Sequence, residues 1–236
     1  MLGTFETDAN LDAQMFTKET SMKAAWRLPV MAILLTTMVG FGRSPYWQGN
    51  DRFNKHDYRG AIEAYTKAIE SDSLNFPAWF HRGTAHEHLN ELELALSDYD
   101  RAVGIAPGFG LAYHYRGHVH SRLAADDLAI ADYDRALASA GEAVVDAHGV
   151  MLQVDKASVY YDRGNAYFRL GKYEPAIASY DSSLMLAPKL AAAYNNRGVS
   201  RLKLGDRAGA CSDRSRGCEL GLSDACAWVR DSCRTH

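Results

Sequence analysis

Residues 76–109 read FPAWFHRGTAHEHLNELELALSDYDRAVGIAPGF, and this 34-residue stretch recurs along the chain in altered form. Five glycines mark the repetition: Gly49, Gly83, Gly117, Gly164 and Gly198. They are separated by 34, 34, 47 and 34 residues, and the interval of 47 equals one 34-residue step plus 13 inserted residues. Self-similarity at a fixed period of roughly 20–50 residues is typical of repeat architectures. The sequence therefore predicts one structural unit used about five times.

Three further columns of residues keep the same intervals as the glycines. They contain Ala61, Ala95, Ala129, Ala176 and Ala210; Tyr65, Tyr99, Tyr133 and Tyr180; and Ala68, Ala102, Ala136, Ser183 and Gly217. The spacing suits two helices in each unit, the first carrying the glycine and the second carrying the alanine and the tyrosine. A residue with no side chain or a single methyl group lets two helix backbones approach to the near end of the usual ~8–10 Å separation. The columns therefore predict a tight helix crossing in every unit.

These columns resemble the tetratricopeptide repeat family over roughly residues 44–222. The resemblance rests on an aromatic residue at repeat position 4, Gly at 8, Ala at 20, an aromatic residue at 24, a small residue at 27 and Pro at 32. Position 4 is Trp79, Tyr113, Tyr160 and Tyr194, and position 32 is Pro107 and Pro188. The resemblance implies an all-α fold, a right-handed α–α superhelix of about five helix-turn-helix repeats with a C-terminal capping helix. It also implies a non-catalytic scaffold or adaptor without a cofactor, which binds a peptide or protein partner in its concave groove.

We expect three parts along the chain. Residues 1–42 form an N-terminal tail with a signal peptide or membrane anchor, residues 43–222 the solenoid, and residues 223–236 the capping helix. The expected repeats are about 44–75, 76–109, 110–141, 157–190 and 191–222, with the insertion at about 141–156. The Ala and Val content of the insertion favours an extension of the preceding helix and a loop at Gly149. We interpret the insertion as a spacer that changes the pitch of the solenoid; a partner-binding finger is the alternative.

An uncharged apolar stretch between Arg27 and Arg43 bears on the compartment. As a helix, residues 28–42 would be about 22 Å long, which is short of the ~30 Å bilayer core and suits a signal peptide. Acidic residues precede Lys23, whereas Met22 begins a basic segment, so we expect synthesis to start at Met22 and cleavage to fall near Gly42. The protein is then periplasmic or secreted. The alternatives are a membrane anchor at the cell envelope through residues 28–42 and a buried apolar helix.

All four cysteines, Cys211, Cys218, Cys226 and Cys233, lie near the C-terminus with spacings of 7, 8 and 7. A spacing of seven places two residues two turns apart on one face of a helix. If two helices fold back on one another at residues 221–224, Cys218 faces Cys226 and Cys211 faces Cys233. We prefer this nested pairing among the three that four cysteines permit, with a zinc site and reduced thiols as alternatives.

The segment from Gly217 to Cys226 also resembles the disulfide-closed hairpins of Sel1-like, cysteine-rich bacterial repeat proteins. Disulfides at these positions imply an oxidising compartment such as the periplasm. This agrees with the signal peptide expected from the apolar N-terminal stretch.

In the tetratricopeptide repeat family, the first helix of each unit lines the groove, with repeat positions 5, 9 and 13 on one inward-facing stripe. The resemblance places in the groove Phe80, Thr84, His88, His114, His118, Arg122, Tyr161, Asn165, Arg169, Asn195 and Lys203. Position 13 is basic in units two to five, in a chain of formal net charge -3. Arg can bond both oxygens of a carboxylate, and Asn can bond a peptide backbone. We therefore hypothesise an acidic segment or a C-terminal carboxylate as the ligand; the alternative is basic groups that only favour the helix C-termini.

Histidines gather in the first helices of units two and three. They are His81, His86, His88, His114, His118 and His120. His114 and His118 stand one turn apart, a spacing that suits a transition metal, but no acidic residue shares their stripe. We therefore expect polar groove residues and no metal site. A cell-envelope hydrolase or small-molecule binder that uses this His cluster is the alternative function.

Other classes of function lack a signal in the sequence. The chain contains no GxxxxGK[ST], GxGxxG or GxSxG string, so the common nucleotide-binding and hydrolase motifs are absent. Its 26 Lys and Arg residues are outnumbered by 29 Asp and Glu residues. Because nucleic-acid binding depends on a basic excess that neutralises phosphates, we expect no nucleic acid among the partners.

Overall fold

The computed structural model describes residues 43–139, 144–145 and 151–233. The expected start at Met22, the signal peptide or anchor of residues 28–42 and the loop at Gly149 lie outside the described residues. The described helices all belong to one compact unit, Pro45–His236. Among the helices of the described ranges, none combines the length and the apolar character that a membrane span needs.

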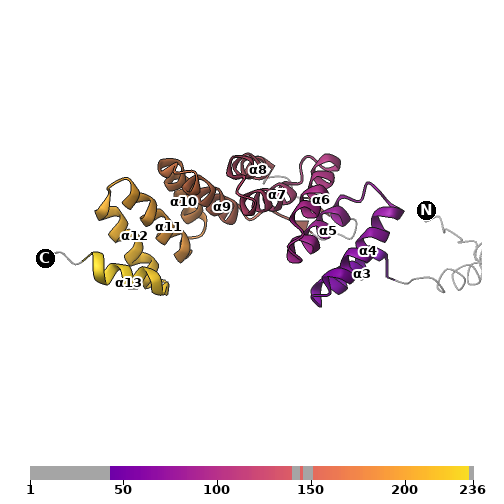
Figure 1. Cartoon of the computed structure of the whole chain (residues 1–236), viewed down its shortest axis with the longest axis horizontal. Helices are drawn as coiled ribbons and strands as arrows, with labels where there is room; N and C mark the ends of the chain where they lie inside the picture. Colours follow the sequence, from indigo (N-terminus) through magenta and orange to yellow (C-terminus); the bar gives the residue numbers. More distant parts are fainter. Residues whose placement is uncertain (1–42, 140–143, 146–150, 234–236) are drawn as a thin grey trace, which may run out of the picture. The chain divides into compact units, whose positions relative to one another are not determined.

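Helices pack as consecutive hairpins throughout this unit. The pairs are α3 (Pro45–Asn54) with α4 (Tyr58–Ser71), α5 (Phe76–His88) with α6 (Leu92–Ile105), α7 (Gly110–Arg122) with α8 (Asp126–Ser139), α9 (Lys156–Arg169) with α10 (Tyr173–Leu186), and α11 (Ala191–Lys203) with α12 (Arg207–Glu219). Each hairpin packs against the next, and α13 (Ser223–Ser232) packs on α12 (Figure 1). The predicted all-α, right-handed superhelix of about five helix-turn-helix repeats with a C-terminal capping helix is confirmed.

The repeated glycines lie where the two helices of each hairpin cross. A Cβ atom added at Gly83 would stand 2.9 Å from the Tyr99 ring, and one at Gly164 would stand 2.6 Å from the Tyr180 ring. These separations are shorter than any real Cβ contact, so only glycine fits against the buried tyrosine. In the fifth unit the opposing residue is Arg214, which replaces the tyrosine. The periodic glycine and tyrosine columns are thus two halves of one contact.

An arginine directly precedes the crossing glycine in units two to five and forms a further recurrent column. These arginines are Arg82, Arg116, Arg163 and Arg197. Arg116 on α7 donates to Asp132 on α8, with Nε 2.9 Å from Oδ2, and to Asp100 on α6, with Nη1 2.6 Å from Oδ1. Arg82 and Arg197 also bond a buried aspartate of the helix that follows them. Arg163 bonds Ser179 at the equivalent place. Each arginine therefore joins the two helices of its own hairpin, and each also bonds a residue of the preceding hairpin.

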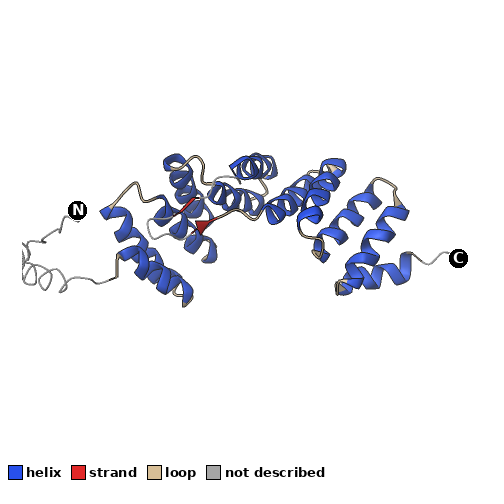
Figure 2. Cartoon of the chain, turned by 180° about the vertical axis from the view of Figure 1, so that it is seen from behind, coloured by secondary structure: helices blue, strands red, loops and turns tan. Residues whose placement is uncertain are grey.

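The inserted segment does not extend the preceding helix, so that expectation was wrong. Helix α8 ends at Ser139, and β1 (Val144–Val145) pairs antiparallel with β2 (Met151–Leu152) (Figure 2). Valine is stiff at its first side-chain torsion and favours extended backbone, which outweighs the alanine content that suggested a helix. After β2, Val154 is buried and joins the apolar cluster formed by α5 to α9. The insertion therefore returns to the body of the protein directly before α9.

The C-terminal hairpin is held differently from the others. Within the described residues, no apolar core cluster includes a residue of α12 or α13, and Ala225 is the buried residue of α13. Instead, disulfides join Cys211 to Cys233 and Cys218 to Cys226, which is the nested pairing. The Cα–Cα distances are 5.7 Å and 4.6 Å. The capping helix is thus attached mainly by covalent links.

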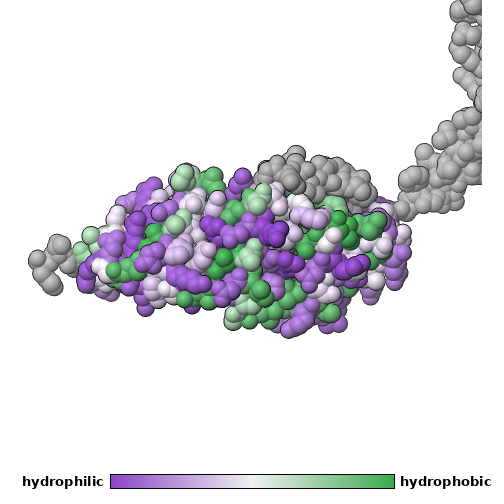
Figure 3. All heavy atoms as spheres, turned by 90° about the horizontal axis from the view of Figure 1, so that it is seen from above, coloured by the Kyte–Doolittle hydropathy of each residue, from purple (hydrophilic) through white to green (hydrophobic). Residues whose placement is uncertain are grey.

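Exposed apolar side chains are scattered along the solenoid. They include Leu74 before α5, Leu128 on α8 and Met185 on α10. On the face drawn in Figure 3, hydrophobic and hydrophilic residues are interspersed over the described part of the chain. Ligand sites are usually concave, so the cavities of the described part of the chain are the candidate binding sites.

Candidate functional site

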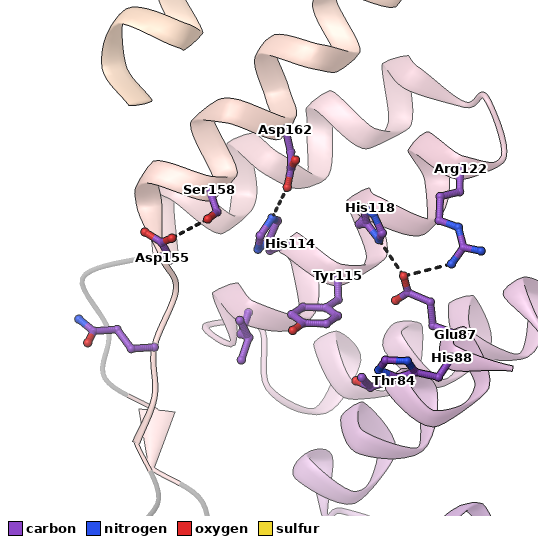
Figure 4. Close-up of a pocket in the computed structure, with 12 residues that line it drawn as sticks. Thr84, Glu87, His88, His114, Tyr115, His118, Arg122, Asp155, Ser158 and Asp162 are labelled. Carbon is purple, nitrogen blue, oxygen red and sulfur yellow. Dashed lines mark hydrogen bonds and ion pairs between the residues drawn. The ribbon is translucent and has the colours of Figure 1, made fainter. Parts of the chain in front are cut away.

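The candidate site is a cavity of about 520 Å³ between the first helices of three consecutive hairpins. It is lined by Thr84, Glu87, His88, Leu111, His114, Tyr115, His118, Arg122, Gln153, Asp155, Ser158 and Asp162 (Figure 4). These residues belong to α5, α7, α9 and the segment after β2. The volume falls within the roughly 300–1,000 Å³ that is usual for ligand pockets.

A second cavity, of about 290 Å³, adjoins the first and shares His118, Arg122 and Asp162 with it. It adds Ser121, Tyr133, Asn165 and Arg169. The two cavities therefore lie side by side along the first helices, and we call them together the α5–α7–α9 groove.

Helical periodicity explains why α7 supplies so many of the lining residues. His114, His118 and Arg122 stand four residues apart in turn, and Leu111 and Tyr115 stand three or four residues from members of this row, so the five share one broad face of the helix. The opposite face carries the buried residues that pack against α8. Burial of one face of α7 in the solenoid therefore fixes the direction in which the groove residues point.

Seven of the predicted groove residues line these cavities. They are Thr84, His88, His114, His118, Arg122, Asn165 and Arg169. Tyr161, Asn195 and Lys203 lie outside both cavities. Tyr161 packs against Tyr180, and the Asn195 amide bonds Asn196, whereas Lys203 is exposed at the end of α11. The groove thus covers the middle three hairpins and does not include the predicted residues of α11.

Phe80 is not a groove residue, which corrects the expectation from the repeat position. Its side chain is only 3% exposed and packs edge-to-face against Phe109 and Tyr115. The apolar ring of Phe80 packs in the core, whereas His114, at the equivalent position of the next unit, lines the cavity. Phe80 therefore supports the groove from beneath.

The basic side chains of the groove are already paired with carboxylates. Arg122 donates to Glu87 Oε1 at 3.3 Å and to Asn90 Oδ1 at 2.6 Å. Arg169 bonds both oxygens of the buried Asp126 and also donates to Ser121. The sequence suggested a ladder of available cations, and within the described groove its two arginines are instead neutralised by neighbouring helices.

Two histidine–carboxylate bonds join the three first helices across the groove. His118 on α7 meets Glu87 on α5, with Nδ1 2.7 Å from Oε1, and His114 on α7 meets Asp162 on α9, with Nε2 2.8 Å from Oδ2. Figure 4 shows both bonds on opposite sides of Tyr115. No acidic residue shares the stripe of these histidines, as the sequence indicates, but carboxylates of the neighbouring helices α5 and α9 reach them.

The Glu87–His118 bond shifts the pKa values of both partners. The hydrogen bond from Glu87 raises the pKa of His118 against the opposing effect of burial. Burial tends to raise the pKa of Glu87, but its bonds to His118 and Tyr99 and the charge of Arg122 outweigh burial and lower it. Both shifts favour the charged forms of the two partners.

Glu87, Tyr115 and Asp162 are groove residues that the sequence reasoning missed. They occupy repeat positions 12, 6 and 6, next to the predicted stripe, so a wider stripe would have included them. Gln153 and Asp155 come from the end of the insertion, whose approach to the groove has no periodic signal in the sequence.

The remaining polar groups of the described groove bear on the hydrolase alternative and on metal binding. Ser158 donates to Asp155 Oδ2 at 2.5 Å, so its hydroxyl bonds a helix-capping carboxylate and not His114. Across the part of the chain that the structure describes, no three His, Cys, Asp or Glu side chains are grouped so as to hold a metal ion. The geometry gives the hydrolase alternative no nucleophile paired with a base.

Two family models match the chain. A model described as a tetratricopeptide repeat matches residues 46–108, and a model described as a TPR repeat matches residues 164–205.

Known proteins with similar sequences match over one short region. A DnaJ homolog subfamily C member 7 homolog of Dictyostelium discoideum is 33% identical over 70 residues, which are 28% of this chain and 13% of that protein. The small glutamine-rich tetratricopeptide repeat-containing protein 2 of Mycosarcoma maydis is 40% identical over 67 residues, 28% of this chain and 19% of that protein. The chain therefore spans less than a fifth of the length of these relatives.

Solved structures with the same fold cover much more of the chain. The MamA protein superposes with a TM-score of 0.65 and 23% identity, over 75% of this chain and 89% of that chain. YrrB, described as a TPR protein with an unusual peptide-binding site, superposes with a TM-score of 0.64 and 17% identity, over 78% and 88%. The family models identify tetratricopeptide repeats in residues 46–108 and 164–205, and the stacked hairpins and these neighbours show that the chain has the fold of a tetratricopeptide repeat solenoid.

Proposed function

We propose that this protein is a non-catalytic scaffold that binds an extended peptide or a segment of a partner protein in the α5–α7–α9 groove. The observation that carries the proposal is the pair of adjoining cavities along the first helices of three hairpins. An extended ligand needs a surface of this length, which the first helices of three successive hairpins supply. YrrB, a structural neighbour, is described as having a peptide-binding site, which supports the same role.

The lining suits a polypeptide ligand. Gln153 is exposed at the cavity wall, and Asn165 keeps its amide hydrogens available because its Oδ1 accepts from Tyr180 and Asn196. Such groups can bond the backbone of an extended peptide, while the apolar surfaces of Leu111 and Tyr115 take up side chains. A flexible peptide loses conformational freedom on binding, so we expect moderate affinity.

A cavity-filling substitution tests the proposal. In Gln153→Trp, a large ring replaces an exposed side chain that forms no hydrogen bond within the described residues, so the fold should be retained. The matched control is Glu93→Trp, which places the same ring at an exposed position of α6 away from the groove. We expect peptides selected on the immobilised protein from a random library to lose binding to the first variant and keep it to the control. Equal binding to both variants would place the partner elsewhere.

For the compartment, we propose that the protein works at the bacterial cell envelope, periplasmic or secreted, with a membrane anchor as the alternative. Support comes from the two disulfides that use all four cysteines, because disulfides persist in oxidising compartments. The test is mass spectrometry of the mature N-terminus together with cell fractionation. A chain that begins at Met1 and is recovered from the cytosol with free thiols would contradict the proposal.

A further inference from the structure

We propose that the α5–α7–α9 groove selects a peptide carrying a lysine or arginine, whose charge lies against Asp162 and Asp155. This inference rests on the proposed function and adds the chemistry of the ligand. It reverses the sign of the charge that the sequence suggested, because the cations of the groove are already occupied.

On the α5 side of the larger cavity, the charged groups are bonded to one another. Glu87 has a side chain only 12% exposed and receives hydrogen bonds from His118, Arg122 and Tyr99. Arg122 uses one terminal nitrogen for Glu87 and the other for Asn90. A carboxylate on the ligand would have to displace these partners, so it would gain little net free energy.

The α9 side of the same cavity carries two carboxylates without a permanent cation. Asp162 accepts from the His114 ring, and Asp155 accepts from the Ala157 backbone N–H and from the Ser158 hydroxyl. Among the described residues, no lysine or arginine forms an ion pair with either aspartate. The N-terminus of α9 stabilises the charge of Asp155, but Asp162 lies beyond the first turn and keeps an oxygen available to the cavity.

The adjoining cavity does not supply the missing cation. Its Arg169 bonds Asp126, which is buried, and this pair lies on the side of the groove away from Asp155. The larger cavity therefore contains three carboxylates against Arg122 and His118, and both of these basic groups are already bonded to Glu87. Charge complementarity consequently favours a cationic ligand over an anionic one.

Helix α7 provides an apolar surface for the methylene groups of a basic side chain. This surface lies between the carboxylates of the α9 side and the bonded Glu87 on the α5 side. Leu111 and Tyr115 line the cavity, and the Tyr115 ring is held edge-on against Phe80, with the centroids 5.2 Å apart. Burial and the negative charge of Glu87 raise the pKa of Tyr115, in keeping with a negative local field. The methylene groups of lysine or arginine pack on such surfaces, and the cation is attracted to an aromatic face.

The test uses the full chain and three pools of short acetylated and amidated peptides. The pools have identical random flanks of Ala, Ser, Leu and Tyr and differ in a central Lys, Gln or Glu. Fluorescence polarisation should show the Lys pool binding about tenfold tighter than the Gln pool, because a charge-assisted hydrogen bond contributes about that factor. The Glu pool should bind most weakly.

Variants assign the preference to the two aspartates. Asp162→Asn removes the charge and keeps an oxygen for His114, and Asp155→Asn keeps a good helix N-cap. The double variant should reduce the Lys-to-Gln ratio to about one. The control Asp134→Asn neutralises a carboxylate of α8 that bonds Arg163 outside the groove, and it should preserve the ratio.

Four results would overturn the inference. A Glu pool that binds as tightly as the Lys pool, or a Lys preference that survives in the double variant, refutes the charge assignment. If the three pools bind the wild type equally and Gln153→Trp abolishes that binding, the peptide groove of the proposed function stands, and only the preference for a basic side chain is refuted. Failure of every pool to bind removes both.

Discussion

Arg116 holds the central hairpin in place through two carboxylates of very different exposure, so replacing each carboxylate separates the two contacts. The guanidinium lies on α7 and is 19% exposed. Asp132 on α8 is 6% exposed, and Asp100 on α6 is 62% exposed. The bonds to Asp132 are the main cause of the raised pKa of Arg116, with burial opposing them.

The exposures predict unequal effects on the free energy of unfolding. Removing one partner of a buried ion pair leaves the other charge desolvated, which costs about 3–5 kcal/mol. Arg116→Ala and Asp132→Ala should fall in that range, whereas Asp100→Ala should cost less than about 1 kcal/mol because water screens the exposed pair. Arg116→Lys should recover only part of the loss, since an ammonium cannot bond both oxygens of Asp132 in a planar fork.

Urea denaturation followed by circular dichroism at equilibrium measures these differences, and the double variant of Arg116→Ala with Asp132→Ala completes a mutant cycle. The cycle should give a coupling energy of about 0.5–3 kcal/mol between the two residues. Repeat proteins can unfold in steps, so the transition of the central hairpins is the relevant one. A cost for Asp100→Ala equal to that for Asp132→Ala, or a coupling energy of zero, would refute the reasoning.

Gly117→Ala should destabilise the protein by about 1–3 kcal/mol in thermal denaturation, because its Cβ would stand 2.8 Å from a buried tyrosine ring. The matched control, Gly104→Ala, has no atom within 4 Å of the added Cβ and should be neutral or stabilising by up to about 1 kcal/mol. Equal destabilisation by both substitutions would contradict the close helix crossing at Gly117. Removing the Cys211–Cys233 disulfide, which closes the larger loop, with Cys211→Ser and Cys233→Ser should lower the free energy of unfolding by about 2–4 kcal/mol and expose α13 to limited proteolysis. A C-terminal hairpin that resists the protease in this variant would contradict the covalent attachment of α13. The pKa of His118 is raised in the folded state, so its contribution is fully present below the unfolded value of about 6.5 and is lost as the pH rises through the folded value. His118→Gln should therefore lower the urea midpoint more at acidic pH near 5.5 than at alkaline pH, and an equal effect at both would disprove the linkage.

The fold could be predicted from the sequence because its decisive contacts repeat. Gly83 and Tyr99 belong to columns that recur at the same interval, and they meet at a helix crossing where a Cβ atom would clash with the tyrosine ring. The insertion could not be predicted in the same way. It occurs once, and the pairing of β1 with β2 depends on local backbone preference rather than on a period.

The groove could be predicted only in part, for a related reason. Its position on the first helices and seven of its residues follow from the repeat, but its electrostatics do not. Glu87 and Asp162 reach the α7 histidines from other helices, and neither contact has a signature in a single repeat. A side chain's partner across a stacking interface depends on the three-dimensional offset between units, which spacing along the chain does not encode.

The central claim is that a partner binds along the first helices of the middle hairpins. Amide NMR spectra of the isotope-labelled full chain, recorded with and without a selected peptide, test it most directly. The account predicts shift changes concentrated on α7, with further changes at the start of α9 and the end of α5. Changes confined to the second helices, α4, α6, α8 and α10, with none on α7, would contradict it.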